Sequence, residues 1–315
     1  MKKLLFLLLV LLLLISCNNI IPIPNIDQYS NPGINYFETD LTSIGSRNIN
    51  IDGDFEILLI SDTHFGKTKS GTVFKIAEFE DYIKSNGILN NIDLVINLGD
   101  VSDNSEQAQF DSYQNWSTNL FSVPIINVIG NHDNRNGGVE RFINTVAGTA
   151  STFYCFKASD IHFYVVDSAY RTLGRQQLGY FIDALEKDSS SKKIVLTHIP
   201  LYGSITNFYA SFADEKERNF LLSNLSKFGV DLLLTGHKHA DESYYSYTQS
   251  FTEVVVHAFH GDAMRNSRPS FYTCTYKKNA SLFTINSYSY NGSTFEKIGE
   301  HSYTLKWPII LMGHT

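Results

Sequence analysis

Between residue 54 and about residue 240, short apolar runs alternate with longer amphipathic stretches. The apolar runs show no polar alternation, which is typical of strands that are buried on both faces. Alternating strands and helices indicate an α/β architecture. We expect strands at 55–60, 94–98, 124–129, 194–196 and 232–234, and helices at 74–85, 106–120, 139–146, 175–186 and 215–227.

The rest of the chain is expected to add antiparallel strands. Residues 153–156 and 161–166 flank a Ser-Asp turn and are expected to pair with each other. After about residue 250 the pattern becomes strand-like. The strands expected there are 253–257, 271–276, 282–288 and 302–306.

Each of the five buried strands is followed at once by residues with metal-binding or acid–base side chains. Sites in α/β sheets form outside the carboxyl ends of parallel strands, so these side chains are expected to share one crevice. Gly99, Gly130 and Gly236 allow the backbone to turn sharply beside them. The five segments are Ser61-Asp62-Thr63-His64, Gly99-Asp100-Val101-Ser102-Asp103, Gly130-Asn131-His132-Asp133, Thr197-His198 and Thr235-Gly236-His237-Lys238-His239.

The side chains of these segments indicate a metal site. Imidazole, carboxylate and amide oxygen together suit Mn, Fe, Co, Ni or Zn. No cysteine joins the set, which argues against a structural zinc site. A single ion would not use all the candidate ligands, whereas two ions about 3.5–4 Å apart that share one carboxylate would. The candidates are Asp62, His64, Asp100, Asn131, His198, His237 and His239.

In chain order the segments read Asp-x-His, Gly-Asp-x-x-Asp, Gly-Asn-His-Asp, His and Gly-His-x-His, over about residues 54–240. This order resembles the calcineurin-like metallophosphoesterases. The resemblance implies a four-layer α-β-β-α sandwich of two mixed β-sheets flanked by helices. It also implies an enzyme that hydrolyses phosphoric esters, either phosphomonoesters or phosphodiesters, with two divalent metal ions such as Mn, Fe or Zn as cofactors.

The resemblance further implies a role for each site residue. His132 takes the place of the family's catalytic histidine, and Asp103 orients it through a hydrogen bond that fixes its tautomer. Two divalent ions outweigh the charge of two aspartates and a bridging hydroxide, so the site would attract phosphate. The hydroxide would attack phosphorus, and His132 would protonate the leaving alkoxide. One ion is expected at Asp62, His64, Asp100 and His239, and the second at Asp100, Asn131, His198 and His237, with Asp100 bridging.

The chain differs at two positions from two branches of this family, and these differences narrow the expected class of substrates. Protein Ser/Thr phosphatases carry Arg directly after the third motif aspartate, where this chain has Asn104. Purple acid phosphatases have Tyr where Asp103 stands and lack a histidine at the position of His64. We therefore expect a small phosphorylated substrate and no tyrosinate–Fe(III) centre.

Composition and charge exclude several other classes of protein. Of the 315 residues, 43% are hydrophobic and 18% are charged, so the chain can bury a large core. The net charge of −7 argues against a nucleic-acid polymer as partner. Three cysteines are too few for a disulfide scaffold. For Cys155 and Cys274, a disulfide and two free thiols are both open.

The N-terminal segment has the form of an export signal. Lys2 and Lys3 precede the apolar run 4–15, which is shorter than the roughly 20 residues that a membrane-spanning helix needs. Leu14-Ile15-Ser16-Cys17 resembles a bacterial lipobox, which implies cleavage before Cys17 and a lipid anchor on it. The alternative is an ordinary export signal with an incidental cysteine.

These features predict an exported protein that is anchored by lipid to a membrane of the bacterial cell envelope. We expect a signal peptide at 1–16, the lipidated cysteine and a flexible tether at 17–50, and a single metallophosphoesterase domain at 51–310. The alternative function is a non-catalytic surface-binding or metal-binding lipoprotein that keeps the fold. Degenerate relatives usually lose ligands, and the complete set in this chain argues against that alternative.

Several residues near the expected site have ordinary explanations as well as functional ones. Arg135 and Lys238 are either solvated charges or phosphate contacts, and Asp133 is expected to shape its loop. The aromatics of the loop 202–213, which are Tyr202, Phe208, Tyr209 and Phe212, either pack that loop or line a substrate-binding lip. The histidines that match no motif position are His162, His257, His260, His301 and His314.

Overall fold

The computed structural model describes residues 45–188, 192–201, 211–239, 243–247, 251–263 and 267–306. The expected signal peptide, Cys17 and most of the expected tether lie outside the described residues. Tyr202, Phe208, Tyr209 and His314 also lie outside them. The described part of the chain contains no helix with the length and apolar character of a membrane span.

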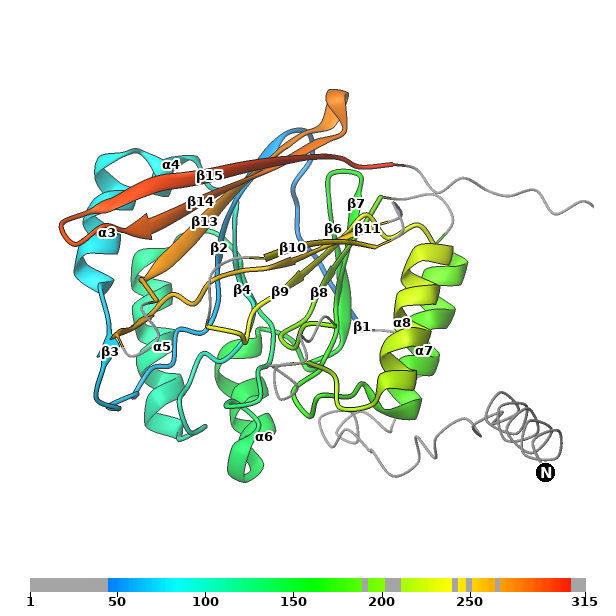
Figure 1. Cartoon of the computed structure of the whole chain (residues 1–315), viewed down its shortest axis with the longest axis horizontal. Coiled ribbons are helices and arrows are strands. Elements are labelled where there is room, and N and C mark those ends of the chain that lie inside the picture. Colours follow the sequence, from blue (N-terminus) through cyan, green and yellow to red (C-terminus); the bar gives the residue numbers. More distant parts are fainter. Residues whose placement is uncertain are drawn as a thin grey trace, which may run out of the picture.

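Two mixed β-sheets pack face to face at the centre of the structure (Figure 1). The six-stranded sheet has the order β15 (Phe295–Thr304), β14 (Leu282–Tyr290), β13 (Ser270–Lys277), β2 (Phe55–Ile60), β4 (Leu94–Asn97) and β5 (Ile125–Asn127). The seven-stranded sheet has the order β1 (Gly45–Arg47), β6 (Tyr154–Ala158), β7 (Ile161–Val165), β8 (Lys192–Leu196), β9 (Leu232–Thr235), β11 (Phe251–Val255) and β10 (Ser243–Tyr247).

Each sheet contains a parallel centre and antiparallel additions. Strands β2, β4 and β5 are parallel, whereas β13 is antiparallel to β2 and β14 and β15 continue the antiparallel pattern. Strands β7, β8, β9 and β11 are parallel, whereas β6 and β10 are antiparallel to their neighbours β7 and β11. A separate two-stranded ladder joins β3 (Thr72–Val73) to β12 (Gly261–Asp262).

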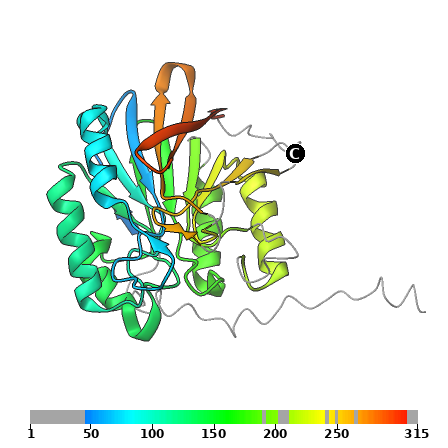
Figure 2. The same ribbon diagram turned by 60° about the vertical axis from the view of Figure 1, so that its left-hand side comes forward.

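Helices cover the outer face of each sheet, so the fold has four layers (Figure 2). Phe79 packs with Leu58 and Val95 on the outer face of the six-stranded sheet, and Phe181 packs with Val195 on that of the seven-stranded sheet. The predicted α-β-β-α sandwich is therefore confirmed. The helices are α3 (Ile76–Ser85), α4 (Ile88–Asn91) and α5 (Gln107–Leu120) on one side, α7 (Gly174–Lys187) and α8 (Glu215–Lys227) on the other, and α6 (Gly138–Phe142).

Burial on both faces explains the unbroken apolar runs of the central strands. Along β2, Ile57 and Leu59 lie in the core between the two sheets. Leu58 and Ile60 point the other way and pack with the helical layer. Since neither face of β2 meets solvent, no position selects for a polar side chain.

Most of the expected elements are present near their predicted bounds. The strand predicted at 55–60 and the helix predicted at 215–227 begin and end as expected. Helix α8 begins there because the carboxylate of Asp214 accepts hydrogen bonds from the backbone N–H groups of Lys216 and Glu217. The helix predicted at 139–146 is divided, since α6 continues as a π-helical turn at Ile143–Ala147.

The five strands that precede the expected ligands are divided between the two sheets. Their carboxyl ends nevertheless meet, because the sheets approach closely at this edge. A Cβ atom on Gly236 would lie 1.9 Å from Oγ of Ser61, so only glycine lets the loop after β9 reach the loop after β2. Gly99 has a φ of +103°, and a Cβ there would lie 2.6 Å from Nδ1 of His198.

Candidate metal centre

The seven predicted ligands lie on the loops that follow the five central strands. Five of them have backbone φ angles between +43° and +71°, a region that residues other than glycine rarely adopt. Such strain is typical of functional sites, where the surrounding structure holds it in place. The five are Asp62, His64, Asp100, His237 and His239.

The ligands expected for the first ion converge. One ligand atom from each of Asp62, His64, Asp100 and His239 lies within 4.8 Å of all the others. Nε2 of His239 is 2.8 Å from Oδ1 of Asp62 and 3.1 Å from Nε2 of His64. The other carboxylate oxygen of Asp62, Oδ2, accepts hydrogen bonds from Ser61 Oγ at 2.6 Å and from the backbone N–H of His237 at 3.0 Å.

The ligands expected for the second ion form an adjoining group. Atoms of Asp100, His198 and His237 lie within 4.8 Å of one another. Asn131 completes the group, because its Oδ1 lies 3.2 Å from Nε2 of His198. Nδ1 of His198 donates to the carbonyl of Leu98 at 2.7 Å, which leaves Nε2 as the metal-binding atom.

Asp100 belongs to both groups, and its carboxylate supports a bridging role. Oδ2 of Asp100 is buried and accepts no hydrogen bond from the described residues. It lies 3.5 Å from Nε2 of His64 and 3.2 Å from Nε2 of His198. A buried carboxylate oxygen without a donor is costly, whereas a cation shared by the two groups would satisfy it. The donor set therefore fits a pair of divalent metal ions.

The charge states of most of the cluster also suit cations. Burial lowers the pKa values of His64 and His237 to about 4, so both are neutral at pH 7, as metal binding requires. Burial would raise the pKa of Asp100, but His198 and His64 outweigh it and hold that pKa well below its usual range. Burial would lower the pKa of His198, but Asp100 outweighs it and raises that pKa to about 9, so His198 holds a proton that a metal ion would have to displace.

His132 lies at the edge of the two groups. Its ring centroid is 4.5 Å from that of His64, and its backbone N–H donates to Oδ1 of Asp100 at 2.8 Å. Nδ1 of His132 donates to the main-chain carbonyl of Asp103 at 2.6 Å, and Nε2 accepts from Arg135 at 2.8 Å. Burial lowers the pKa of His132, so the ring is neutral in this arrangement.

A hydrogen bond between His132 and Asp103 is thus present, but its acceptor is the main-chain carbonyl of Asp103 and not the carboxylate. The Asp103 carboxylate lies 3.6 Å from Nδ1 of His132 and only 3.1 Å from Nδ1 of His64. The hydrogen bond with His64 lowers the pKa of Asp103. The side chain of Asp103 therefore positions His64, a predicted metal ligand, and this contact could not be read from the motif.

Asp133 shapes its loop, as predicted. Its buried carboxylate accepts hydrogen bonds from the backbone N–H groups of Val101, Ser102 and Gly130, and from the hydroxyl of Ser102. Burial and the nearby Asp100 raise the pKa of Asp133 to about 7. Asp133 thereby joins the loop after β4 to the loop after β5.

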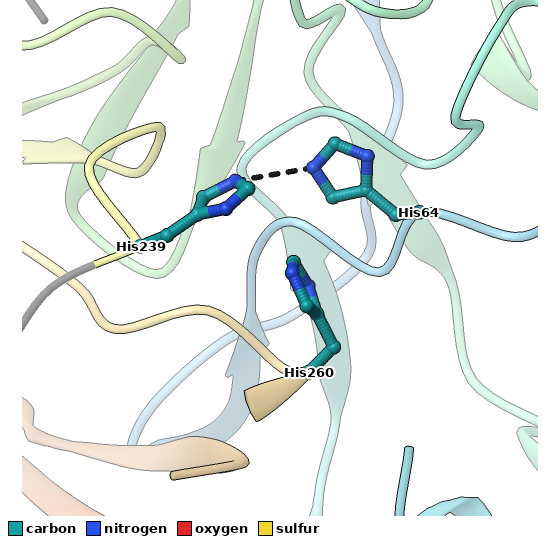
Figure 3. Close-up of side chains that lie close together, drawn as sticks. All are labelled: His64, His239 and His260. Carbon is teal, nitrogen blue, oxygen red and sulfur yellow. Dashed lines mark hydrogen bonds between the residues drawn. The ribbon is translucent and has the colours of Figure 1, made fainter. Parts of the chain in front are cut away.

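His260, which matches no motif, also belongs to the site. Figure 3 shows its ring beside those of His64 and His239, with centroid separations of 5.0 and 4.7 Å. The three histidines can also place one nitrogen each within 4.8 Å of one another. His260 follows β11, the parallel neighbour of β9, so the rule of strand ends could have found it.

Four of the other residues considered from sequence lie outside the ligand cluster. Nδ1 of His162 is 2.7 Å from Asp188, away from the motif loops. Phe212 is buried in the core beneath α7 and α8, which favours the packing role for that aromatic. Cys155 and Cys274 are free thiols.

Comparison with known proteins agrees with the fold. The sequence profile of the calcineurin-like phosphoesterases matches residues 55–241. No curated protein matches the sequence. The structure is similar to the purple acid phosphatase PPD1 from yellow lupin (Lupinus luteus) seeds, with a TM-score of 0.63 and 16% identity over 80% of this chain and 54% of that chain. This chain thus spans about half the length of that phosphatase.

A second similar structure is GAP50, the anchor in the inner membrane complex of Plasmodium. Its TM-score is 0.58, with 14% identity over 81% of this chain and 90% of that chain. Likeness at such identities shows a shared fold and no more. The profile match covers more than half of the chain and includes all seven predicted ligands. The chain therefore belongs to the calcineurin-like phosphoesterase family.

Proposed function

We propose that this protein hydrolyses phosphoric esters with two divalent metal ions. The observation that carries the proposal is the Asp100 carboxylate, which lies between two ligand groups and has a buried oxygen without a hydrogen-bond donor among the described residues. One ion would be held by Asp62, His64, Asp100 and His239, and the other by Asp100, Asn131, His198 and His237.

Two residues of the chain, His132 and Arg135, have proposed roles beside the two ions. When bound, the two ions would polarise the phosphoryl oxygens and lower the pKa of a water molecule. To act as the proton donor, His132 would first take up a proton from solvent at Nε2, while the Asp103 carbonyl holds the proton already on Nδ1. It would then pass the Nε2 proton to the leaving-group oxygen. The Arg135 guanidinium, which contacts Nε2 of His132 at 2.8 Å, would turn to the bound phosphate when His132 acts.

We also propose that the enzyme is exported and anchored by lipid on Cys17. The support is Lys2 and Lys3, the apolar run 4–15 and the lipobox-like Leu14-Ile15-Ser16-Cys17. An enzyme in that position would act on small phosphorylated molecules outside the cytoplasm. Radiolabelled palmitate incorporated by the wild type and not by Cys17→Ala would support the anchor, and equal incorporation would contradict it.

The test of hydrolysis uses the full chain in detergent, loaded separately with Mn²⁺, Zn²⁺ or Fe²⁺. Bound metal is measured first, and then turnover of p-nitrophenyl phosphate and bis-p-nitrophenyl phosphate. Two equivalents of metal with hydrolysis of either ester would support the proposal. Asp100→Asn should lose metal and activity, while His301→Ala, an exposed substitution on β15, should keep both.

Other outcomes would select the alternative functions. Two equivalents of metal without turnover of any phosphoric ester would indicate a metal-binding protein. A chain that binds no metal would indicate a surface-binding protein that keeps the fold.

A further inference from the structure

Lys67 lies at the rim of the first ligand group, three residues after His64. The chain turns back at Gly66, where φ is +89°, and the backbone N–H of Lys67 donates to the carbonyl of His64 at 3.0 Å. A Cβ atom on Gly66 would meet the side chain of Gln109 at 2.5 Å, so this turn depends on glycine. The half-buried side chain of Lys67 then returns toward the site.

The ammonium of Lys67 is held by His260. Nζ of Lys67 lies 3.1 Å from Nε2 of His260, and Nδ1 of His260 donates to the carbonyl of Asp62 at 2.8 Å. Because Nδ1 carries the proton, Nε2 has a lone pair that accepts from Lys67. An ammonium has three N–H donors, and one imidazole acceptor leaves others for a ligand.

The two segments that carry this pair are fixed to each other. After Lys67 the chain forms β3, and after His260 it forms β12, which pairs with β3. The N–H of Ala263 also donates to the carbonyl of Gly71 at 2.8 Å. The His260 ring is almost fully buried against His64 and His239 (Figure 3). Lys67 is thus positioned before any substrate arrives.

Lys67 brings a positive charge close to the carboxylates of the expected metal centre. Burial lowers the pKa of Lys67, while the carboxylates of Asp103, Asp62 and Asp100 oppose that shift. Those carboxylates are two ligands and the residue that positions a third ligand. The His260 ring that holds the ammonium lies 5.0 Å from the His64 ring and 4.7 Å from the His239 ring, centroid to centroid. A substrate phosphoryl group bound at the first ion would therefore lie beside the same ammonium.

We propose that Lys67, positioned by His260, binds a phosphoryl oxygen of the substrate and makes this enzyme prefer phosphomonoesters to phosphodiesters. A phosphomonoester carries close to two negative charges near pH 7, whereas a diester carries one and has a second organic group in place of the extra oxygen. A fixed cation beside the first ion therefore favours the monoester. The inference rests on the proposed hydrolysis of phosphoric esters and names its substrate class.

The first test compares Lys67→Met with the wild type, using the full chain in detergent loaded with Mn²⁺. Because the variant loses a charge-assisted hydrogen bond to the substrate, we expect kcat/KM for p-nitrophenyl phosphate to fall by roughly 10- to 100-fold. We expect a rise in KM and in the inhibition constant of inorganic phosphate, with both metals retained. Turnover of bis-p-nitrophenyl phosphate should change by less than about threefold. Lys67→Arg should restore part of the loss, and Lys69→Met, at an exposed lysine, is the matched control.

The second test concerns His260 as a positioning residue. His260→Ala should raise KM for the monoester with little change in kcat, and His260→Gln, which keeps an acceptor for Lys67, should recover part of the affinity. Loss of one metal equivalent in His260→Ala would overturn the inference, since His260 would then be a ligand.

The remaining outcomes separate this inference from the proposed function. Suppose that the wild type hydrolyses either ester. If Lys67→Met then lowers kcat/KM for both esters equally, or leaves kcat/KM for the monoester unchanged, the inference is wrong and the proposed hydrolase function is still supported. If the wild type prefers the diester, the inference is also wrong. If the metal-loaded wild type hydrolyses neither ester, the proposed function fails and the inference fails with it.

Discussion

The carboxylate of Asp103 lies 3.1 Å from Nδ1 of His64, whereas its distance to Nδ1 of His132 is 3.6 Å. This contact keeps the proton of His64 on Nδ1 and leaves Nε2 for a metal ion. The main-chain carbonyl of Asp103 accepts from Nδ1 of His132 at 2.6 Å. One residue thus orients a metal ligand with its side chain and the proposed proton donor with its backbone.

A substitution of Asp103 should therefore act first on the metal. We expect Asp103→Ala to weaken binding of the first ion by about 10- to 100-fold, because His64 loses the group that orients it. Turnover at saturating metal should fall much less, since the backbone contact with His132 remains. Metal titration followed by assays over a range of Mn²⁺ concentrations measures both. Unchanged metal affinity with a large loss of saturated turnover would mean that the carboxylate acts on His132.

Substitution of His132 should have the opposite effect. His132→Ala removes no ligand, so both metal equivalents should remain while kcat falls by about 10²- to 10⁴-fold. The loss should be larger for glycerol phosphate, whose alkoxide needs a proton to leave, than for p-nitrophenyl phosphate. Metal analysis and kcat for the two esters check this. A normal rate with both metals bound would exclude His132 as the proton donor.

The buried Asp133 should matter for stability. Asp133→Ala leaves the N–H groups of Val101, Ser102 and Gly130 without their acceptor. Since each buried unsatisfied group costs about 1–3 kcal/mol, we expect the free energy of unfolding to fall by about 3 kcal/mol or more. Urea unfolding of the metal-loaded protein measures this loss. Asp111→Ala, at an exposed position of α5, is the control, and an equal effect of both substitutions would contradict the role.

The central fold could be predicted because its signal is local. Strands such as β2 are apolar on both faces, and α8 begins at a capping aspartate, Asp214. Strand β15 was expected only near its end, at 302–306. Its first residue, Phe295, is buried, but most of the positions that follow are exposed, so the strand has no apolar run. Strands β1 and β10 and the single turn of α4 were not expected at all.

Only the part of the site that belongs to sequence motifs could be predicted. The seven ligands follow apolar strands at motif spacing, and the structure brings them together. His260 lies beyond the motifs, 196 residues after His64, and only the pairing of β11 with β9 brings it to the site. From the motifs we expected Asp103 to orient His132, whereas its carboxylate lies nearer His64. The motifs could not show this, because it depends on a side-chain rotamer.

The histidines also predict how the stability of the metal-free protein depends on pH. Burial lowers the pKa values of His64 and His237 to about 4 and that of His260 to about 3, below the value of about 6.5 in an unfolded chain. Between pH 6.5 and pH 4 the unfolded state therefore binds more protons than the folded state. The free energy of unfolding is therefore highest, as far as these histidines are concerned, above pH 6.5, and it falls as the pH drops through this range.

His198 acts in the opposite direction, because Asp100 outweighs burial and raises its pKa to about 9. Its contribution is complete below pH 6.5 and is lost as the pH rises toward 9. On the acid side Asp133 opposes the three histidines, because its raised pKa of about 7 makes the folded state bind the extra proton there. Three rings outweigh one carboxylate, so we expect the free energy of unfolding of the chelator-treated protein to be greatest near pH 7. It should fall on both sides, by up to about 3 kcal/mol for each histidine whose pKa is near 4. Urea unfolding at pH 5, 7 and 9 measures the curve, and His260→Asn should make its acid side less steep. The same slope between pH 7 and pH 5 in the wild type and in His260→Asn would show that the His260 ring is not held neutral by burial.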